Sequence, residues 1–237
     1  MAPNIILTND GQTDGFDILR EKGMKTYHFP MIRTSINNES ANFSLKDFDI
    51  FIFTSKNGVK YFFEHPNIKS QLSQNISTIS IGSKTQEILE KYNTKNIFTA
   101  KRSYSNLLFN DLKNSNLLNS KKVMLVQGNL AKNYLFENLK MICYLTKFVS
   151  YNTEPIEVVN KTLEKLLDKE ETLTVFTSPS GFLSFENLYD VNKTSIISIG
   201  ETTSSCIKER GYNPLITSKM QSYEGVSASI ISNLKTN

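Results

Sequence analysis

The chain has 237 residues, a formal net charge of +4, 39% hydrophobic residues and 21% charged residues, which suits a globular protein of one large or two small domains. Its Lys and Arg residues are scattered instead of gathered in blocks, which argues against a nucleic-acid-binding surface. No apolar run approaches the roughly 18 residues that a membrane span needs, and the first residues lack the features of a signal peptide. We therefore expect a cytosolic protein that binds neither nucleic acid nor membrane.

The chain has few of the residues that metal binding or thiol chemistry requires. It contains two histidines, His28 and His65, and two cysteines, Cys143 and Cys206, none of them at the spacing of metal ligands. We expect the cysteines to be packing residues and the protein to use no metal.

Short apolar runs alternate with segments of helical periodicity along the whole chain. Strands are predicted at residues 4–8, 25–31, 50–53, 76–81, 96–99, 123–126, 144–151, 174–176, 197–199 and 215–217. Helices are predicted around residues 16–22, 59–63, 88–92, 107–112, 135–139, 158–167 and 226–231, and a further helix is predicted after each of the turns at Gly181 and Gly200. Residues 34–49 are polar and are predicted to form a connector. The order of strand and then helix is typical of parallel sheets covered by helices.

The second half of the chain repeats the first. Residues 121–153 follow the plan of residues 4–33, and residues 174–234 follow that of residues 50–112. The repeat predicts two α/β domains of common ancestry. They are either tandem halves, or the middle two segments form one contiguous domain and the outer two form the other.

One repeated motif is a short strand that ends at a glycine and is followed by threonine. Ile79-Ser80-Ile81-Gly82-Ser83-Lys84-Thr85 recurs 118 residues later as Ile197-Ser198-Ile199-Gly200-Glu201-Thr202-Thr203. Each copy predicts a helix capped by threonine, with backbone N–H groups left to bind an anion. Neither copy has the spacing of a phosphate loop or a dinucleotide fingerprint, so a carboxylate is the better ligand.

A second repeated motif places hydroxyl groups where a buried strand gives way to a helix. It reads Phe53-Thr54-Ser55-Lys56-Asn57-Gly58 in the first half and Phe176-Thr177-Ser178-Pro179-Ser180-Gly181 in the second. In open α/β sheets this end of the strand binds ligands. The alternative is that these Ser and Thr residues only cap the helices. Tyr151, at the end of a predicted strand, also has two interpretations: it is either a functional residue or an interfacial aromatic.

Taken in order, these motifs resemble the uroporphyrinogen-III synthase family over essentially the full chain. The resemblance rests on residues 53–59, 81–85, 128–130, 151–155, 176–181 and 199–203. It implies two flavodoxin-like parallel-sheet α/β domains joined by a two-stranded linker. One is a discontinuous domain of residues 1–35 and 152–237, and the other is an inserted domain of residues 36–151.

The resemblance also implies the reaction. Linear hydroxymethylbilane loses water, its last pyrrole ring is inverted through a spiro intermediate, and the macrocycle closes as uroporphyrinogen III. The family uses no metal or organic cofactor, and the bilane closes unaided to the wrong isomer, so the main task is to hold it folded. We expect a monomer that has transient contact with hydroxymethylbilane synthase.

By the same resemblance, Tyr151 is the catalytic residue, which assists departure of water by hydrogen bonding. The substrate carries eight carboxylates, which the two glycine–threonine turns are expected to bind as halves of one cleft. The substrate-binding candidates are Thr54, Ser55, Lys56, Thr85, Gly128, Asn129, Ser178, Ser180, Gly181, Thr202 and Thr203, with Lys132 as a further candidate.

The chain departs from the family at two places. Many members end the first strand in Thr-Arg-Pro, where this chain has Thr8-Asn9-Asp10, and the arginines that bacterial relatives carry after Gly128 are absent. The main alternative function is a non-catalytic binder or regulator of a tetrapyrrole or another poly-acid. A nucleotide-sugar or periplasmic-type binding protein is disfavoured by the missing phosphate motif and signal peptide.

Overall fold

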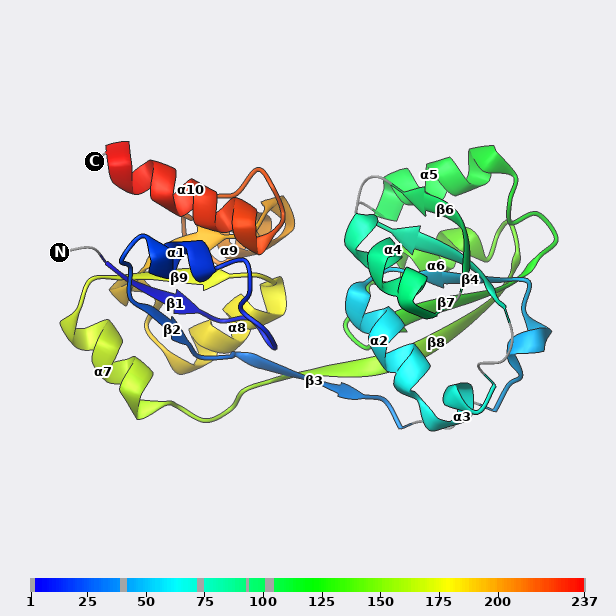
Figure 1. Cartoon of the computed structure of the whole chain (residues 1–237), viewed down its shortest axis with the longest axis horizontal. Coiled ribbons are helices and arrows are strands. Elements are labelled where there is room, and N and C mark those ends of the chain that lie inside the picture. The colour runs from blue at the N-terminus through cyan, green and yellow to red at the C-terminus, as the bar shows by residue number, and fades with distance from the viewer. Residues whose placement is uncertain (1–2, 39–41, 72–74, 93, 101–104, 237) are drawn as a thin grey trace. The chain divides into compact units, whose positions relative to one another are not determined.

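The structure is a computed structural model that describes residues 3–38, 42–71, 75–92, 94–100 and 105–236. The chain forms two compact units (Figure 1): unit 1 contains residues 1–33 and 154–237, and unit 2 contains residues 34–153. The chain crosses from one unit to the other within β3 (Ile32–Ile36) and again within β8 (Tyr144–Pro155), and these two strands are neighbours in one sheet. None of the described helices combines the length and the apolar character needed to cross a membrane.

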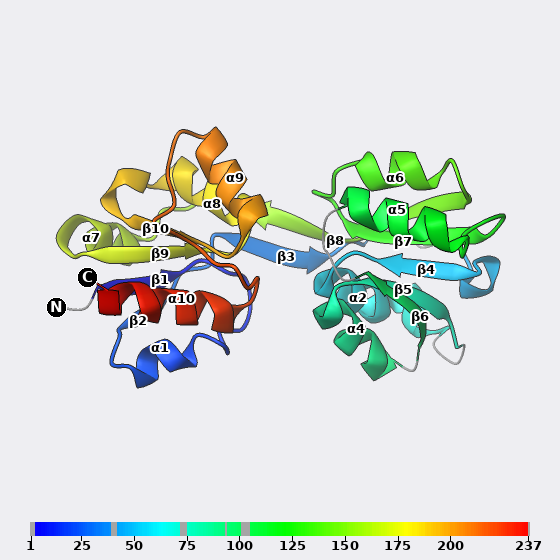
Figure 2. The same cartoon turned by 90° about the horizontal axis from the view of Figure 1, so that it is seen from above.

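Unit 1 is a parallel sheet with helices on both faces (Figure 2). Its strands are β1 (Asn4–Leu7), β2 (Thr26–His28), β9 (Thr172–Phe176), β10 (Ser195–Ser198) and β11 (Ile216–Thr217), in the order β11-β10-β9-β1-β2. One face packs on α1 (Asp17–Glu21) and α10 (Tyr223–Thr236), and the other on α7 (Lys161–Lys169), α8 (Pro179–Leu188) and α9 (Glu201–Glu209). Successive strand residues point to opposite faces, so Ile5 and Leu7 join the first core and Ile6 joins the second.

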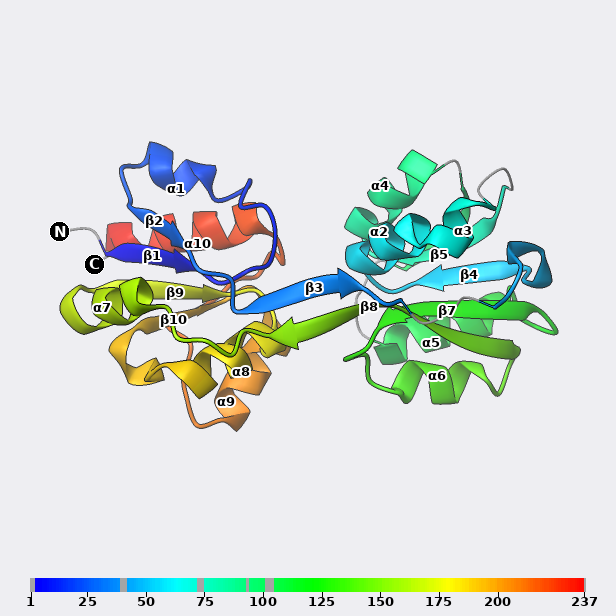
Figure 3. The ribbon, with the colours of Figure 1, turned by 90° about the horizontal axis from the view of Figure 1, so that it is seen from below.

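Unit 2 has the same layers (Figure 3). Its sheet has the order β3-β8-β7-β4-β5-β6 and contains β4 (Ile50–Phe53), β5 (Ser77–Ile81), β6 (Lys95–Ala100) and β7 (Lys122–Gly128). One face packs on α2 (Lys56–Glu64), α3 (Pro66–Lys69) and α4 (Ser83–Leu89), and the other on α5 (Ser105–Ser115) and α6 (Tyr134–Leu139). Phe51 and Phe53 of β4 face α2, where both rings contact Phe62, whereas Ile50 and Ile52 face the opposite helices.

The two units share one strand order. The order β2-β1-β9-β10-β11 in unit 1 matches β8-β7-β4-β5-β6 in unit 2, so β1 is equivalent to β7 and β9 to β4. This is the flavodoxin arrangement, and the predicted fold class is confirmed. The order along the chain differs, because in unit 2 the segments equivalent to β9, β10 and β11 come first.

Two predictions of where elements lie were wrong. Residues 34–36 do not belong to a connector, because they continue β3, an edge strand whose pairing partner β8 lies more than 100 residues away in sequence. Val158, predicted to be in a helix, precedes α7 and is 76% exposed. Residues 34–36 have no strand periodicity of their own, and Val158 continues the apolar pattern of α7 without belonging to the helix. In both cases the packing partners, and not the local pattern, decide the structure.

Candidate functional site

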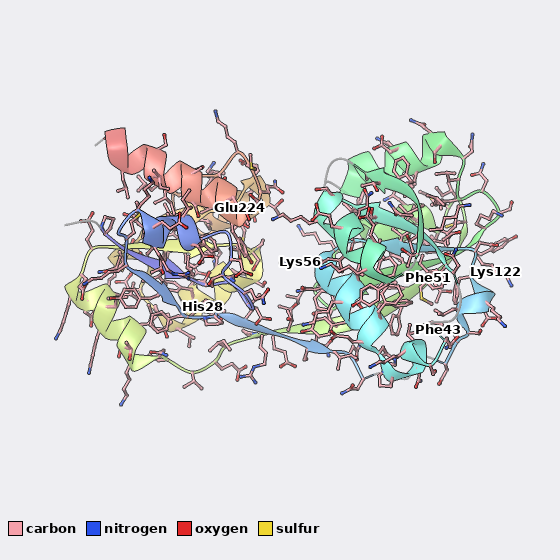
Figure 4. The ribbon with its side chains drawn as sticks, viewed as in Figure 1. His28, Phe43, Phe51, Lys56, Lys122 and Glu224 are labelled. Atoms are coloured by element: carbon pink, nitrogen blue, oxygen red, sulfur yellow. The ribbon has the colours of Figure 1, made fainter. Side chains whose placement is uncertain are left out.

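Each sheet has a point where ligand binding is expected from topology alone. In unit 2 the central strands β7 and β4 run parallel, and the helices that follow them, α6 and α2, cover opposite faces. In unit 1 the same holds for β1 and β9, which are followed by α1 and α8. Ligands of open α/β sheets bind outside the carboxyl ends of such strands. Figure 4 shows Lys56 at this edge of unit 2 and Lys122 at the opposite, amino edge.

Tyr151 lies at the carboxyl edge of unit 2 beside the start of α2. Its hydroxyl group is 3.2 Å from Oγ of Ser55, and its ring stacks on that of Tyr61, with centroids 5.7 Å apart and planes at 24°. Tyr61 is held in turn by Thr34, because its hydroxyl group donates to the Thr34 carbonyl oxygen at 2.9 Å. The structure therefore brings together two predicted site residues, Tyr151 and Ser55, with Tyr61, which the sequence patterns did not single out.

Gly128 makes room for the Tyr151 ring. A Cβ atom at this position would lie 2.5 Å from Cζ and 2.8 Å from the hydroxyl oxygen of Tyr151, closer than atoms in van der Waals contact. Gly128 is paired with Tyr151 in the β7–β8 register. Its geometric role is thus to seat the tyrosine, and that role does not depend on contact with a substrate.

Burial keeps the Tyr151 hydroxyl group protonated. Loss of hydration raises the pKa of Tyr151 above its ordinary value of 10.0, the neighbouring Tyr61 adds to the increase, and the hydrogen bond with Ser55 opposes it. At neutral pH the group is therefore a neutral hydrogen-bond donor.

Ser55 and Asn129 are engaged with the backbone. Ser55 caps α2, because its Oγ accepts the Gly58 N–H at 2.9 Å, and Thr54 precedes it as a half-buried residue. The Asn129 side chain accepts the Thr153 N–H at 2.8 Å and donates to the Thr153 carbonyl oxygen at 3.3 Å. Asn129 thereby fixes the turn after β7 to the end of β8, and Lys132 beyond it is exposed.

Two lysines share the carboxyl edge of unit 2. Lys56 opens α2 and Lys84 lies in the first turn of α4, and both are solvent accessible. The pKa of Lys56 is below its ordinary value of 10.5, because protein atoms around the ammonium group displace part of its hydration and because Lys84 repels it. A paired positive charge of this kind favours a carboxylate ligand. Lys84 is part of the predicted glycine–threonine motif but is not among the predicted site residues.

The glycine–threonine turns are built differently from the prediction. Gly82 and Gly200 occupy the N-cap positions of α4 and α9, and no side chain caps either helix, so the expected capping by threonine was wrong. Thr85 and Thr203 lie at the third helical position and are only 4% and 2% exposed. They are too far into the helix to cap it, whereas Thr202 is exposed. The first amides of α9 therefore have no side-chain hydroxyl bound to them.

The hydroxyl turn of unit 1 mirrors that of unit 2. Ser178 caps α8 by accepting the Gly181 N–H at 3.1 Å, and its Oγ is 3.1 Å from that of Ser180. A Cβ atom on Gly181 would lie 3.3 Å from the Ser178 Oγ and 3.9 Å from the Oγ1 of Thr8, which donates to Val175. The three predicted residues of this turn therefore lie together at the carboxyl edge of unit 1.

The described residues contain no group of three or more His, Cys, Asp or Glu side chains that could hold a metal ion. Cys143 and Cys206 are thiols that pack against separate cores. Burial raises the pKa of Cys143 to about 11, which makes its thiol a poor nucleophile at neutral pH.

In comparison with known proteins, residues 17–228 match the family described as uroporphyrinogen-III synthase HemD. The fold is similar to the uroporphyrinogen-III synthetase of Helicobacter pylori, with 20% sequence identity and a TM-score of 0.69 over 100% of each chain. It is also similar to a mutant uroporphyrinogen III synthase of Thermus thermophilus, with 16% identity and a TM-score of 0.64 over 100% of each chain. These two likenesses show the fold. No curated protein sequence matches the chain.

Proposed function

Because the chain belongs to the uroporphyrinogen-III synthase family, lyases that cyclise hydroxymethylbilane to uroporphyrinogen III, we propose that Tyr151 assists the loss of water. The family match over residues 17–228 carries the assignment of the reaction. The role of Tyr151 is supported by its position at the carboxyl edge of unit 2, where its hydroxyl group lies 3.2 Å from that of Ser55.

The chemistry at Tyr151 is donation of one hydrogen bond. As the hydroxyl group of the bilane leaves, negative charge develops on its oxygen, and a neutral donor stabilises that charge. Tyr151 supplies such a donor because its raised pKa keeps the proton on the phenol. Ser55, which can donate or accept at the Tyr151 oxygen, orients the phenol, and when Ser55 donates, the Tyr151 proton is left for the substrate.

The carboxylates of the substrate are proposed to bind at the strand ends of both units. In unit 2 the candidates are Thr54, Lys56 and Thr85, supported by the two ammonium groups at that edge. In unit 1 they are Ser178, Ser180 and Gly181, which lie together at the start of α8, and Thr202 and Thr203, supported by the uncapped start of α9. For Asn129 we propose an indirect role, through the turn after β7 that its side chain fixes.

We further propose that the protein works as a cytosolic monomer of one discontinuous and one inserted domain and receives the bilane from hydroxymethylbilane synthase. The reactivity of the free bilane supports direct transfer. Neither the family match nor the fold favours a non-catalytic tetrapyrrole binder.

A coupled assay tests the reaction. Hydroxymethylbilane is generated from porphobilinogen with its deaminase, the protein is added, and the oxidised products are separated into isomers I and III. Isomer III above the uncatalysed background is the expected result. Isomer I alone would refute the enzymatic function.

Substitution of Lys84 by methionine should raise the pKa of Lys56 toward 10.5, because it removes the nearby like charge. In the wild type, Lys56 loses its charge at a lower pH than an ordinary lysine, so carboxylate binding should weaken as pH rises through that lowered pKa. The Lys84→Met variant should shift this loss to higher pH. The measurement is KM for hydroxymethylbilane against pH, together with an NMR titration of the Lys56 side chain.

The matched control for Lys84→Met is Lys122→Met, at the amino edge of the same sheet (Figure 4). It removes one positive charge from unit 2 and should leave the pH profile unchanged. Equal shifts in both variants would show that net charge, and not the Lys56–Lys84 pair, sets the profile.

Substitution of Tyr61 by leucine should lower kcat roughly three- to tenfold, because loss of the stacked ring, worth about 0.5–1.5 kcal/mol, leaves Tyr151 poorly positioned. Tyr61→Phe keeps the ring and loses only the hydrogen bonds to Thr34, so it should retain most of the activity. Steady-state kinetics of the two variants decide the matter. Equal losses would assign the effect to the hydroxyl group instead of the ring.

A further inference from the structure

Two buried side-chain oxygens in the described part of the chain have no hydrogen-bond partner: Oδ1 of Asn9 and Oε1 of Gln127. Asn9 is 2% exposed and Gln127 is 4% exposed. A buried carbonyl oxygen without a donor costs free energy, and native proteins seldom keep one without a reason such as a bound water, a ligand or a catalytic role.

The two residues occupy equivalent positions in the two units. Leu7 of β1 is paired with Val175 of β9, and Leu125 of β7 is paired with Ile52 of β4. Val175 and Ile52 each precede the matching Phe-Thr-Ser turn, so Leu7 corresponds to Leu125. Asn9 and Gln127 each lie two positions further on, 118 residues apart, the same spacing that separates the two glycine–threonine motifs.

Both positions lie at the switch point of their sheet. Asn9 follows Thr8, whose Oγ1 lies near the Ser178 turn, and Gln127 precedes Gly128, against which the Tyr151 ring lies. Each unsatisfied oxygen therefore belongs to a residue that adjoins, in sequence, a residue at the candidate site of its own unit.

The orientation of the Asn9 amide is fixed by its neighbours. Its Nδ2 donates to the Gln12 carbonyl oxygen at 2.9 Å, and the amide also hydrogen-bonds the Tyr223 hydroxyl group. The Asn9 backbone carbonyl oxygen is 2.7 Å from Nε2 of His28, which therefore donates. These bonds occupy the amide nitrogen and the backbone oxygen, and they leave Oδ1 as the acceptor without a donor.

An amide oxygen can only accept a hydrogen bond, which decides the kind of ligand. The carboxylates of hydroxymethylbilane are acceptors at neutral pH and would be repelled. The pyrrole nitrogens carry N–H groups whose lone pairs belong to the aromatic system, so they are donors only. Pyrrole N–H is thus the complementary group on the substrate, and it is separate from the carboxylates that the lysines and helix amides suit.

We propose that Asn9 Oδ1 and Gln127 Oε1 are a duplicated pair of acceptors for pyrrole N–H groups of the tetrapyrrole, one in each unit. This assignment rests on the proposed function. Asn9 lies two positions beyond the end of β1, and Gln127 is the penultimate residue of β7, where it is paired with Val149 of β8. In the free protein the unpaired oxygen lowers the free energy of unfolding, and a hydrogen bond from the bound substrate removes this loss.

Gln127→Met is the direct test, because methionine matches glutamine in length and removes the acceptor. KM for hydroxymethylbilane should rise roughly three- to tenfold, the factor for one neutral hydrogen bond, and anaerobic calorimetry should show uroporphyrinogen III binding weakened by a similar factor. The melting temperature should equal or exceed that of the wild type, since an unsatisfied polar group is removed. Asn9→Leu should raise KM similarly, and Gln127→Leu serves if the methionine variant does not fold.

Thr174→Val is the matched control. Thr174 is fully buried in β9 and its hydroxyl group bonds that of Thr194 at 2.8 Å, so this variant should lower the melting temperature and leave KM unchanged. The proposal is overturned if isomer III forms with KM within twofold of the wild type in both Gln127 variants. It is equally overturned if Gln127→Met melts lower, as Thr174→Val does, because Gln127 would then have a structural partner such as a buried water. A wild-type chain that yields only isomer I would instead refute the proposed function itself.

Discussion

Tyr151→Phe is expected to lower kcat about tenfold or more while the protein stays folded. Phenylalanine keeps the ring against Gly128 and Tyr61 but cannot donate to the leaving hydroxyl group. A hydrogen bond to a group that gains charge is worth about 1.5–3 kcal/mol, which corresponds to at least a tenfold change in rate. The measurement is the rate of isomer III formation at saturating bilane, with the melting temperature recorded in parallel.

Tyr189→Phe is the matched control for this substitution. Tyr189 is a buried tyrosine of unit 1 whose hydroxyl oxygen accepts the Asn160 N–H at 2.7 Å. Loss of this hydrogen bond should lower the melting temperature and leave kcat unchanged, which is the reverse of the pattern expected at Tyr151. Wild-type turnover in Tyr151→Phe would remove Tyr151 from the mechanism. The raised pKa of Tyr151 adds a second check, since its ionisation should not lower the wild-type rate below pH 10.0.

Gly128→Ala should impair both activity and stability. The new Cβ atom would lie 2.5 Å from the Tyr151 ring, and because both residues belong to paired strands the backbone has little freedom to move apart. The ring must leave its place beside Ser55, so kcat should fall at least as far as in Tyr151→Phe. The overpacked contact should also cost about 1–3 kcal/mol of unfolding free energy.

A double-mutant cycle identifies the cause of the Gly128→Ala defect. In a Tyr151→Leu background the ring is gone, so Gly128→Ala should cost little further stability and little further activity. Chemical denaturation and steady-state kinetics of the four proteins give both coupling energies. Equal costs in the two backgrounds would mean that Gly128 acts through the backbone or through the substrate, and not by seating Tyr151.

The sequence predicted the fold well because its strongest signals are local. Strands such as β4, with the sequence Ile50-Phe51-Ile52-Phe53, are apolar on both faces, which indicates a parallel sheet covered by helices. The duplicated turns at Ser55 and Ser178 have the same cap geometry in both units, as their matching sequences indicate. β3 was missed because a short edge strand has no periodicity of its own and forms only by pairing with β8.

By itself, the sequence determined the family, the repeated strand-and-helix plan and the candidate turns, because motifs and capping depend on residues near one another in the chain. Only the tertiary structure decided which residues meet. Tyr151 and Ser55 are 96 residues apart and become neighbours through the pairing of β4, β7 and β8. The same register places Asn9 and Gln127 at equivalent points, and the helix geometry buries Thr85 and Thr203. Side-chain direction follows from strand register and helix rotation, which the packing of distant segments sets and no local pattern encodes.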